Sequence, residues 1–138
     1  MKQRSCILIK PDGVQKKVIG KVINRFEEEG LRLIAMKMIP PDIKRLELFY
    51  AEHREKPFYK RFMKFMLSGP LVASVWEGKD AIARSRKIIG RTDSKEAEKG
   101  SLRNLYGTDN RKNLVHGSDS EKSAQREIAV MFNKFELN

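Results

Sequence analysis

The chain has 138 residues, of which 40% are hydrophobic, and its 29 Lys and Arg outnumber its 18 Asp and Glu to give a formal net charge of +11. A chain of this size can bury roughly two-thirds of its unfolded surface, which predicts one domain over residues 1–138 and excludes a disordered protein. Apolar runs such as residues 6–9 are too short for a membrane span or a signal peptide. We therefore expect a cytoplasmic protein without membrane association. The positive charge favours an anionic partner but does not distinguish nucleotides, nucleic acid and anionic membranes.

Short apolar runs predict four strands, and apolar residues at intervals of three and four predict the helices between them. In chain order we expect a strand over residues 6–9, a helix over 14–29 and a strand over 31–39. A helix capped by Asp42, a short helix from Pro57, a strand over 71–76 and a helix over 80–89 follow. Residues 91–110 are predicted to form a long polar loop, which in a compact domain is often functional. The last strand holds Leu114 and Val115, and the last helix spans 120–131.

This order of elements predicts the fold class. Two strand-helix-strand units flank a helical hairpin, and the connections are short. Such an order suits a four-stranded antiparallel sheet covered on one face by helices, which is a ferredoxin-like α+β sandwich. RNA-binding modules use the same fold, so the fold does not decide the function.

Residues 113–119 carry the clearest chemical signal, because they place a histidine where a buried strand gives way to a helix. Gly117 removes the side chain next to His116 and allows a ligand to approach closely. Ser118 and Glu121 have the spacing of a capping box for the following helix. The positive end of that helix would lie close to His116, which suits a phosphate group.

Glu127 is a second signal, because it falls on the otherwise apolar helical stripe of Ala124, Ile128 and Met131. A buried carboxylate needs a partner, since burial of a lone charge is costly. His116 at the start of the helix is a candidate partner. The alternative is a structural histidine beside a helix cap, which is the more common case, although the neighbouring polar residues favour a functional one.

Two other kinds of site are excluded by their residues. Gly20 and Lys21 do not make a phosphate-binding P-loop, because Gly13 lies at the wrong spacing and Val22 stands where Ser or Thr is needed. One cysteine and two histidines make zinc unlikely, and the cysteine, Cys6, is interpreted as inert packing in a buried strand. Any phosphate would therefore be held by basic side chains.

Arg86 is a candidate for that task, because it stands between Ile82 and Ile89 on the apolar side of a predicted helix. Its guanidinium could simply extend to solvent along an apolar stem. A fork of donors that points into a cleft is also what a polyphosphate requires, so both interpretations stay open.

The stretch Asn113-Leu-Val-His-Gly-Ser-Asp119 closely resembles the active-site signature of nucleoside diphosphate kinases. The resemblance extends over essentially the whole chain through motifs that lie in the family's order. They are Ile9-Lys10-Pro11-Asp12-Gly13, Phe49-Tyr50, Lys56-Pro57-Phe58, Ser68-Gly69-Pro70, Trp76-Glu77-Gly78, the segment with Arg86, Gly90 and Thr92, and Arg103.

This resemblance implies a phosphotransferase with a ping-pong mechanism. ATP would donate its γ-phosphoryl group to Nδ1 of His116, and a nucleoside diphosphate would then accept it. Glu127 and Ser118 would orient the imidazole, which has to be neutral to attack.

The resemblance also implies a set of nucleotide contacts. Lys10 and Asn113 would bond the sugar 3′-hydroxyl, Tyr50 would lie beside the histidine, and Phe58 would stack on the base. Mg²⁺ would bridge the phosphates, and Asp119 would reach it only through water. The phosphates would be held by Arg86, Thr92, Arg103 and Lys10. Taken singly, these residues could be ordinary core or surface groups, whereas together their spacing favours the family.

Some positions depart from the family's pattern. Ser94 and Lys99 stand where many members have prolines, and Arg103 is followed by Asn-Leu-Tyr where Gly-Asp-Phe is common. The resemblance implies a homo-oligomer built from dimers, and the departures leave a hexamer and a tetramer both open.

An alternative function is a basic ferredoxin-like nucleic-acid-binding module that keeps the active site as a relic. That function expects aromatic residues on the sheet face, whereas the aromatic residues here fall mostly in predicted helices. His53 lies among Glu52, Arg54 and Glu55 and is predicted to be a solvated surface residue.

Overall fold

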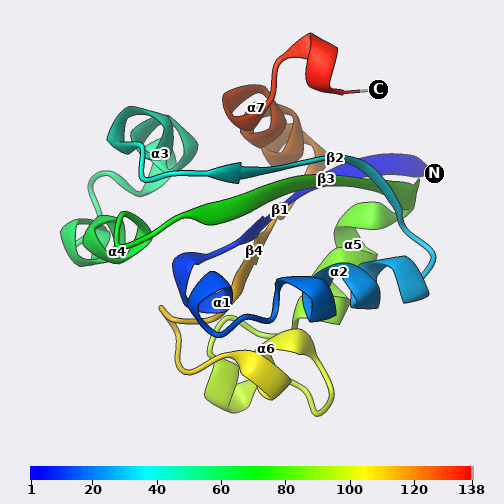
Figure 1. Ribbon diagram of the computed structural model, residues 1–138, viewed down its shortest axis with the longest axis horizontal. Coiled ribbons are helices and arrows are strands. Elements are labelled where there is room, and N and C mark those ends of the chain that lie inside the picture. The colour runs from blue at the N-terminus through cyan, green and yellow to red at the C-terminus, as the bar shows by residue number, and fades with distance from the viewer. Residues whose placement is uncertain (138) are drawn as a thin grey trace.

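In the computed structural model, which describes residues 1–137, four strands form one antiparallel sheet in the order β2-β3-β1-β4 (Figure 1). This arrangement confirms the predicted ferredoxin-like α+β sandwich with a four-stranded antiparallel sheet. The strands are β1 (Lys2–Ile9), β2 (Arg32–Ile39), β3 (Leu71–Lys79) and β4 (Val115–Gly117). Within the described part of the chain, no helix is long and apolar enough to cross a bilayer.

Seven α-helices lie within the described residues, and their bounds differ from the predictions at two places. They are α1 (Pro11–Gln15), α2 (Ile19–Glu28), α3 (Ile43–Phe49), α4 (Tyr59–Met66), α5 (Ala81–Ile89), α6 (Leu102–Tyr106) and α7 (Glu121–Met131). The single helix predicted over 14–29 is wrong, because the backbone takes a left-handed turn at Lys17, with φ of 60°, and so separates α1 from α2. The predicted loop over 91–110 contains α6, whose N-cap is the side chain of Ser101.

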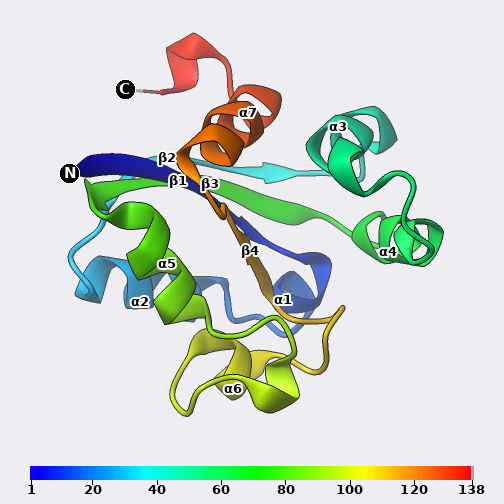
Figure 2. The ribbon, with the colours of Figure 1, turned by 180° about the vertical axis from the view of Figure 1, so that it is seen from behind.

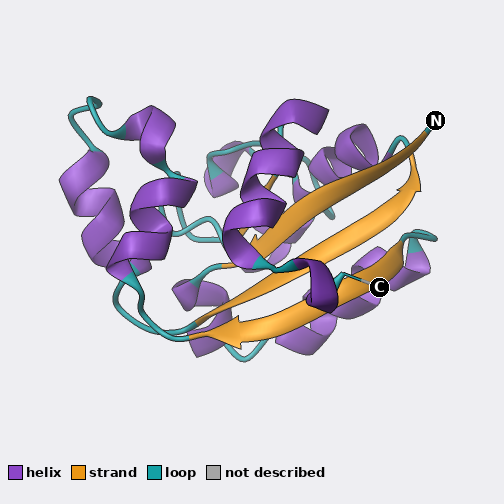
Figure 3. Ribbon diagram, turned by 90° about the horizontal axis from the view of Figure 1, so that it is seen from above, coloured by secondary structure: helices purple, strands orange, loops and turns teal. Residues whose placement is uncertain are grey.

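The prediction that helices cover only one face of the sheet is wrong. Figures 1 and 3 show helices on both sides of it. Along β1, Cys6 and Leu8 join one apolar cluster with α3, α4 and α7, whereas Ile7 and Ile9 join another with α2, α5 and α6. A strand that is buried on both faces reads as a continuous apolar run. The runs in β1 and β3 therefore carried this information.

The first turn after β1 is fastened to the segment before β4. The backbone N–H of Lys10 donates to the Leu114 carbonyl at 2.8 Å, and Asp12 accepts from the Leu114 N–H at 3.0 Å. A Cβ on Gly13 would lie 2.7 Å from Ile9 Cγ2 and 3.2 Å from Leu114 Cδ1, so only glycine lets the turn pack this closely. These bonds place the end of β1 beside His116.

Residues 43–66 form a hairpin that consists of α3, a short 3₁₀ turn over Ala51–His53, and α4. Figures 1 and 2 show α3 and α4 side by side at one end of the molecule, beyond the strands. Asp42 caps α3 as predicted, because its side chain accepts from the N–H of Arg45. We refer to residues 43–66 as the hairpin below.

Candidate active site

A cavity of about 530 Å³ lies where the hairpin meets the ends of β1, β4, α5 and α7. Residues from nearly every part of the chain reach it. All predicted site residues except Ser118 line its wall, namely Lys10, Tyr50, Phe58, Arg86, Thr92, Arg103, Asn113, His116, Asp119 and Glu127. Ser118 lies fully buried behind this wall.

His116 is held at one ring nitrogen. Its Nε2 lies 2.9 Å from Glu127 Oε1, and the hydroxyl of Ser118 donates to that same oxygen at 2.7 Å. A carboxylate only accepts, so Nε2 carries a hydrogen, and the neutral tautomer that makes this bond has its lone pair on Nδ1. Nδ1 has no hydrogen-bond partner among residues 1–137, and the side chain is 20% exposed. The imidazole therefore offers an unprotonated nitrogen to the cavity.

The predicted capping role of Ser118 is wrong. Helix α7 begins at Glu121, and its N-cap is Ser120, whose side chain accepts from the N–H of Ser123. The hydroxyl of Ser118 instead accepts from the backbone N–H of Cys6 at 3.0 Å while it donates to Glu127. It thus connects strand β1 to the carboxylate that holds the histidine.

Two aromatic rings of the hairpin pack against the imidazole. The centroid of His116 lies 4.9 Å from that of Phe49 and 6.0 Å from that of Tyr50, both in edge-on geometry. The hydroxyl of Tyr50 is buried and has no hydrogen-bond partner within the described chain. Burial raises the pKa of this phenol, so it stays neutral. It remains available as a donor to a ligand oxygen.

The buried ammonium of Lys10 is the centre of a polar chain. Its Nζ donates to Asn113 Oδ1 at 2.7 Å, and the Asn113 amide donates to the Thr92 carbonyl at 2.9 Å. Burial, together with the charge of Arg103, lowers the pKa of Lys10 to about 7. The site thus contains a cation that loses its charge near neutral pH.

Arg103 connects the end of α5 to the segment that leads into β4. Its guanidinium donates to the carbonyls of Gly90, Asn113 and Val115 at 3.0, 3.1 and 2.7 Å. Burial and the nearby charge of Arg86 lower its pKa to about 10. Arginine has five N–H donors, so two remain for a ligand. Arg103 is therefore first a structural clamp, and its contact with phosphate stays a prediction.

Arg86 combines its two predicted interpretations, a guanidinium that extends to solvent and one that points into a cleft. The residue is exposed on α5, yet it lines the cavity, and its Nη1 lies 3.4 Å from the Gly117 carbonyl.

A Cβ on Gly117 would lie 2.7 Å from Ile89 Cδ1, so the glycine leaves room for α5 rather than for a ligand.

The prediction for His53 is wrong, because this residue is half-buried and lines the cavity. Its ring centroid lies 6.0 Å from that of Phe58, whose side chain is 49% exposed. Burial and the charge of Lys56 lower the pKa of His53. His53 lies three residues after Tyr50, which places both on the same side of a helical turn. This spacing was the sequence feature that could have predicted His53 in the cavity.

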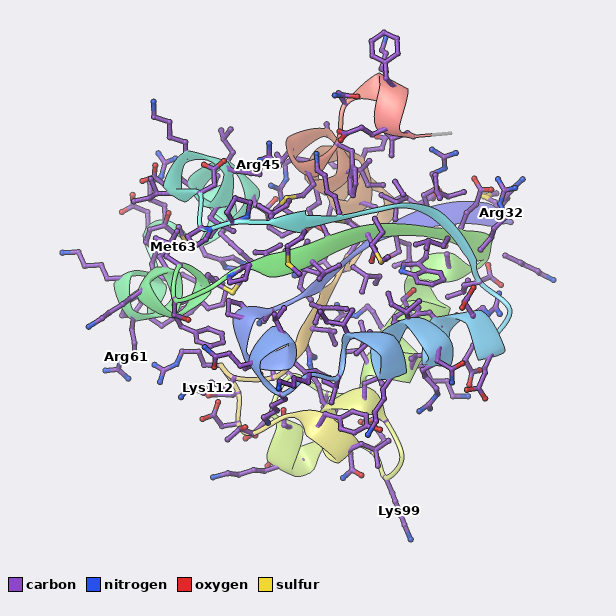
Figure 4. All side chains as sticks on the ribbon, in the orientation of Figure 1. Arg32, Arg45, Arg61, Met63, Lys99 and Lys112 are labelled. Carbon is purple, nitrogen blue, oxygen red and sulfur yellow. The ribbon has the colours of Figure 1, made fainter. Side chains whose placement is uncertain are left out.

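Cations outnumber carboxylates around the cavity. Arg61, Arg111 and Arg126 also line the cavity and were not predicted from the sequence. Figure 4 shows Lys112 on the same side of the molecule as Arg61. The lining carboxylates are Glu52, Asp119 and Glu127. Among residues 1–137, no group of three or more His, Cys, Asp or Glu side chains could hold a metal ion. The excess of cations in this wall suits a polyanion.

A family model described as nucleoside diphosphate kinase matches residues 3–137. The nucleoside diphosphate kinase of Helicobacter pylori (strain Shi470) is 52% identical over 132 residues, which cover 96% of each chain. The Synechococcus sp. (strain JA-3-3Ab) enzyme of the same name is 48% identical over 135 residues, which cover 98% of this chain and 91% of the relative.

Solved structures give the same result. The Aquifex aeolicus nucleoside diphosphate kinase superposes with a TM-score of 0.97 at 45% identity, over 100% of both chains. The Halobacterium salinarum nucleoside diphosphate kinase, solved in complex with CDP, gives a TM-score of 0.96 at 41% identity and covers 100% of this chain and 92% of its own.

The low pKa of Lys10 predicts that binding of a polyphosphate is coupled to proton uptake. At about pH 8 the free protein holds Lys10 mostly neutral, and nearby phosphates raise its pKa and protonate it. Calorimetric titration with ADP in two buffers of different ionisation enthalpy measures this uptake. We expect it to be smaller at about pH 6, where Lys10 is already charged, and to be lost in Lys10→Met. The exposed Lys44→Met is the control, and equal uptake in Lys10→Met and wild type would contradict the assignment.

Proposed function

The chain belongs to the nucleoside diphosphate kinase family of phosphotransferases, and we propose that it transfers the γ-phosphoryl group of ATP, or of another nucleoside triphosphate, to a nucleoside diphosphate through a phosphohistidine at His116. The observation that carries this proposal is the hydrogen bond from His116 Nε2 to Glu127, which leaves Nδ1 open to a cavity lined by cations. An unprotonated imidazole nitrogen in such surroundings is a nucleophile for phosphorus.

The reaction divides into two transfers at the same atom. In the first, the Nδ1 lone pair of His116 attacks the γ-phosphorus, and the bond to the leaving oxygen of ADP breaks. In the second, a terminal phosphate oxygen of a nucleoside diphosphate attacks the phosphohistidine and releases the neutral ring. Glu127 and Ser118 keep the imidazole in one orientation throughout. His116 Nε2 donates to Glu127 Oε1, and the hydroxyl of Ser118 donates to the same oxygen.

The cationic wall would hold the phosphates and stabilise charge during transfer. Arg86 and Thr92 approach from α5 and the segment after it, Lys10 approaches from the end of β1, and Arg103 contributes its two remaining donors. The buried hydroxyl of Tyr50, which has no hydrogen-bond partner among residues 1–137, would donate near the transferred group. These assignments rest on the common cavity and on the chemistry of each side chain.

The nucleoside would lie toward the hairpin. Lys10 and Asn113 already share a hydrogen bond and would take the sugar 3′-hydroxyl between them. The half-exposed ring of Phe58 would stack on the base. Stacking uses the π-face that every base has, so it supports use of several nucleotides.

Magnesium would enter with the nucleotide. Mg²⁺ is commonly bound through one or two carboxylates and substrate phosphates, and it keeps several waters. Asp119 lines the cavity, and a hydrogen bond from Ser123 lowers the pKa of its carboxyl, so it would be ionised to hold a magnesium-bound water. When bound, the ion neutralises phosphate charge.

The alternative of a relic site in a nucleic-acid-binding module is not favoured. Both faces of the sheet are covered by helices, and Trp76 is fully buried against Phe26. The sheet of the described chain therefore presents no open aromatic surface on which bases could stack.

Assembly into a homo-oligomer, as a hexamer or a tetramer built from dimers, is part of the proposal. Strand β2 ends the sheet, and Met36 and Met38 on it are 47% and 53% exposed. An edge strand with exposed apolar side chains is usually covered by another chain. The cytoplasmic location stays a prediction from the sequence.

His116 provides the direct test. Incubation with γ-labelled ATP and magnesium should label the wild-type protein through a bond that is stable in base and labile in acid. His116→Ala should carry no label, because no other residue would form that bond. Label that remains in His116→Ala, or that survives acid, would falsify the assignment of the nucleophile.

Glu127→Gln tests the orienting role of the carboxylate. Glutamine keeps the size of the side chain but cannot accept from both partners with a full charge. We expect nucleotide affinity to be retained, whereas the phosphorylation rate of His116 should fall on the order of 10²-fold. Rapid-mixing measurement of labelling, beside the melting temperature, separates the two roles. A normal rate with lowered stability would mean that Glu127 is only structural.

Phe58→Ala tests the stacking platform. Loss of base–aromatic stacking should weaken all nucleotides by a similar amount, roughly 1–3 kcal/mol each. Competition binding with four nucleoside diphosphates measures the change for each base. Leu105→Ala, at an exposed residue outside the cavity, is a matched control. A loss confined to one base would show that the site reads base edges instead.

A further inference from the structure

Arg126 connects α7 to the hairpin. Its Nη1 donates to the carbonyl of Phe49 at 2.9 Å and to that of Leu48 at 3.3 Å. Both carbonyls belong to the last two residues of α3, where the four final carbonyls have no amide partner within the helix. A cation at this end also interacts favourably with the helix dipole. Arg126 therefore acts as a C-terminal cap of α3 that is supplied from another helix.

The same guanidinium lies beside the site's buried carboxylate. Its Nη2 is 3.8 Å from Glu127 Oε2 and 3.7 Å from Glu52 Oε1. Glu127 uses its other oxygen for His116 and Ser118. One side chain thus contacts both the group that orients the histidine and the backbone of the hairpin.

The anchored backbone carries residues that reach the cavity. Phe49, whose carbonyl Arg126 binds, packs its ring against His116, and Tyr50 follows directly. Phe58 lies further along the same hairpin. Apolar contacts of Leu46 and Phe49 also attach the hairpin to the core, so loss of Arg126 would shift the hairpin rather than unfold the chain.

We propose that Arg126 is a positioning residue that sets the hairpin, and with it the nucleoside-binding side of the cavity, at a fixed place relative to His116. The inference rests on the proposed function, because it concerns the distance between the base platform and the phosphoryl acceptor. Arg126 itself touches no reacting atom in this proposal. It acts through Phe49 and Tyr50.

The test compares two phosphoryl donors in Arg126→Met and wild type. With ATP, the concentration that half-saturates His116 labelling should rise about tenfold, which is the scale of one lost charge-assisted hydrogen bond. Phosphoramidate has no nucleoside. Its P–N bond breaks, ammonia leaves, and a bond from phosphorus to Nδ1 forms. Its rate should stay within about twofold of wild type, because Glu127 and Ser118 still hold the ring.

Two further variants sharpen the result. Arg126→Lys keeps the charge and can bind one carbonyl, so it should recover part of the ATP affinity. Arg45→Met removes an arginine of α3 that pairs with Asp42 at 3.7 Å, and it should behave as wild type (Figure 4). Melting temperatures are recorded for all variants.

The possible outcomes separate the two proposals. Wild-type protein that ATP does not label would overturn the proposed function itself. If wild type is labelled but Arg126→Met shows an unchanged ATP dependence, or slows equally with both donors, then the positioning role is wrong. A rise specific to ATP, with recovery in Arg126→Lys, supports it.

Discussion

The buried carboxylate of Glu127 organises the site, because a charge placed in the core has to be met by hydrogen bonds. One of its oxygens takes both His116 and Ser118, and Ser118 in turn is bonded to β1. The helix that carries Glu127 packs Ala124 and Ile128 into the core. The orientation of the imidazole is thus determined by the packing of α7 on the sheet, so that the nucleophile needs no flexible loop to hold it.

A second constraint is the crowding of cations around the cavity. Burial and the charge of Arg103 lower the pKa of Lys10, and burial and the charge of Arg86 lower that of Arg103. That repulsion is a cost in the free protein, which structural hydrogen bonds to Asn113 and to backbone carbonyls offset in part. A bound polyphosphate would relieve this repulsion, and the relief would contribute to its binding free energy.

The sequence predicted which residues share the cavity better than it predicted the surroundings of each residue. The stripe on which Glu127 falls has the helical period, and so its pairing with His116 could be inferred from spacing alone. The role of Ser118 could not, because it depends on α7 starting two residues later than the capping pattern implied. By contrast, the helices on both faces could have been predicted, because the continuous apolar run in β1 is typical of a strand that is buried on both faces. The prediction that His53 is solvated is wrong because charged neighbours in the sequence indicate a surface position. Its actual exposure depends on how the hairpin meets α7.

The site therefore combines two supports of different rigidity. Glu127, Lys10 and Arg103 are buried among the sheet and the elements packed on it, where close packing allows little movement. The proposed nucleoside side belongs to the hairpin, which lies beyond the strands (Figure 2). In the proposed reaction, transfer would demand accurate placement of phosphorus at Nδ1, whereas stacking on Phe58 would tolerate displacement and differences between bases. A rigid phosphate side and a separately anchored base side would therefore let one active centre serve several nucleotides without loss of alignment at the reacting atom.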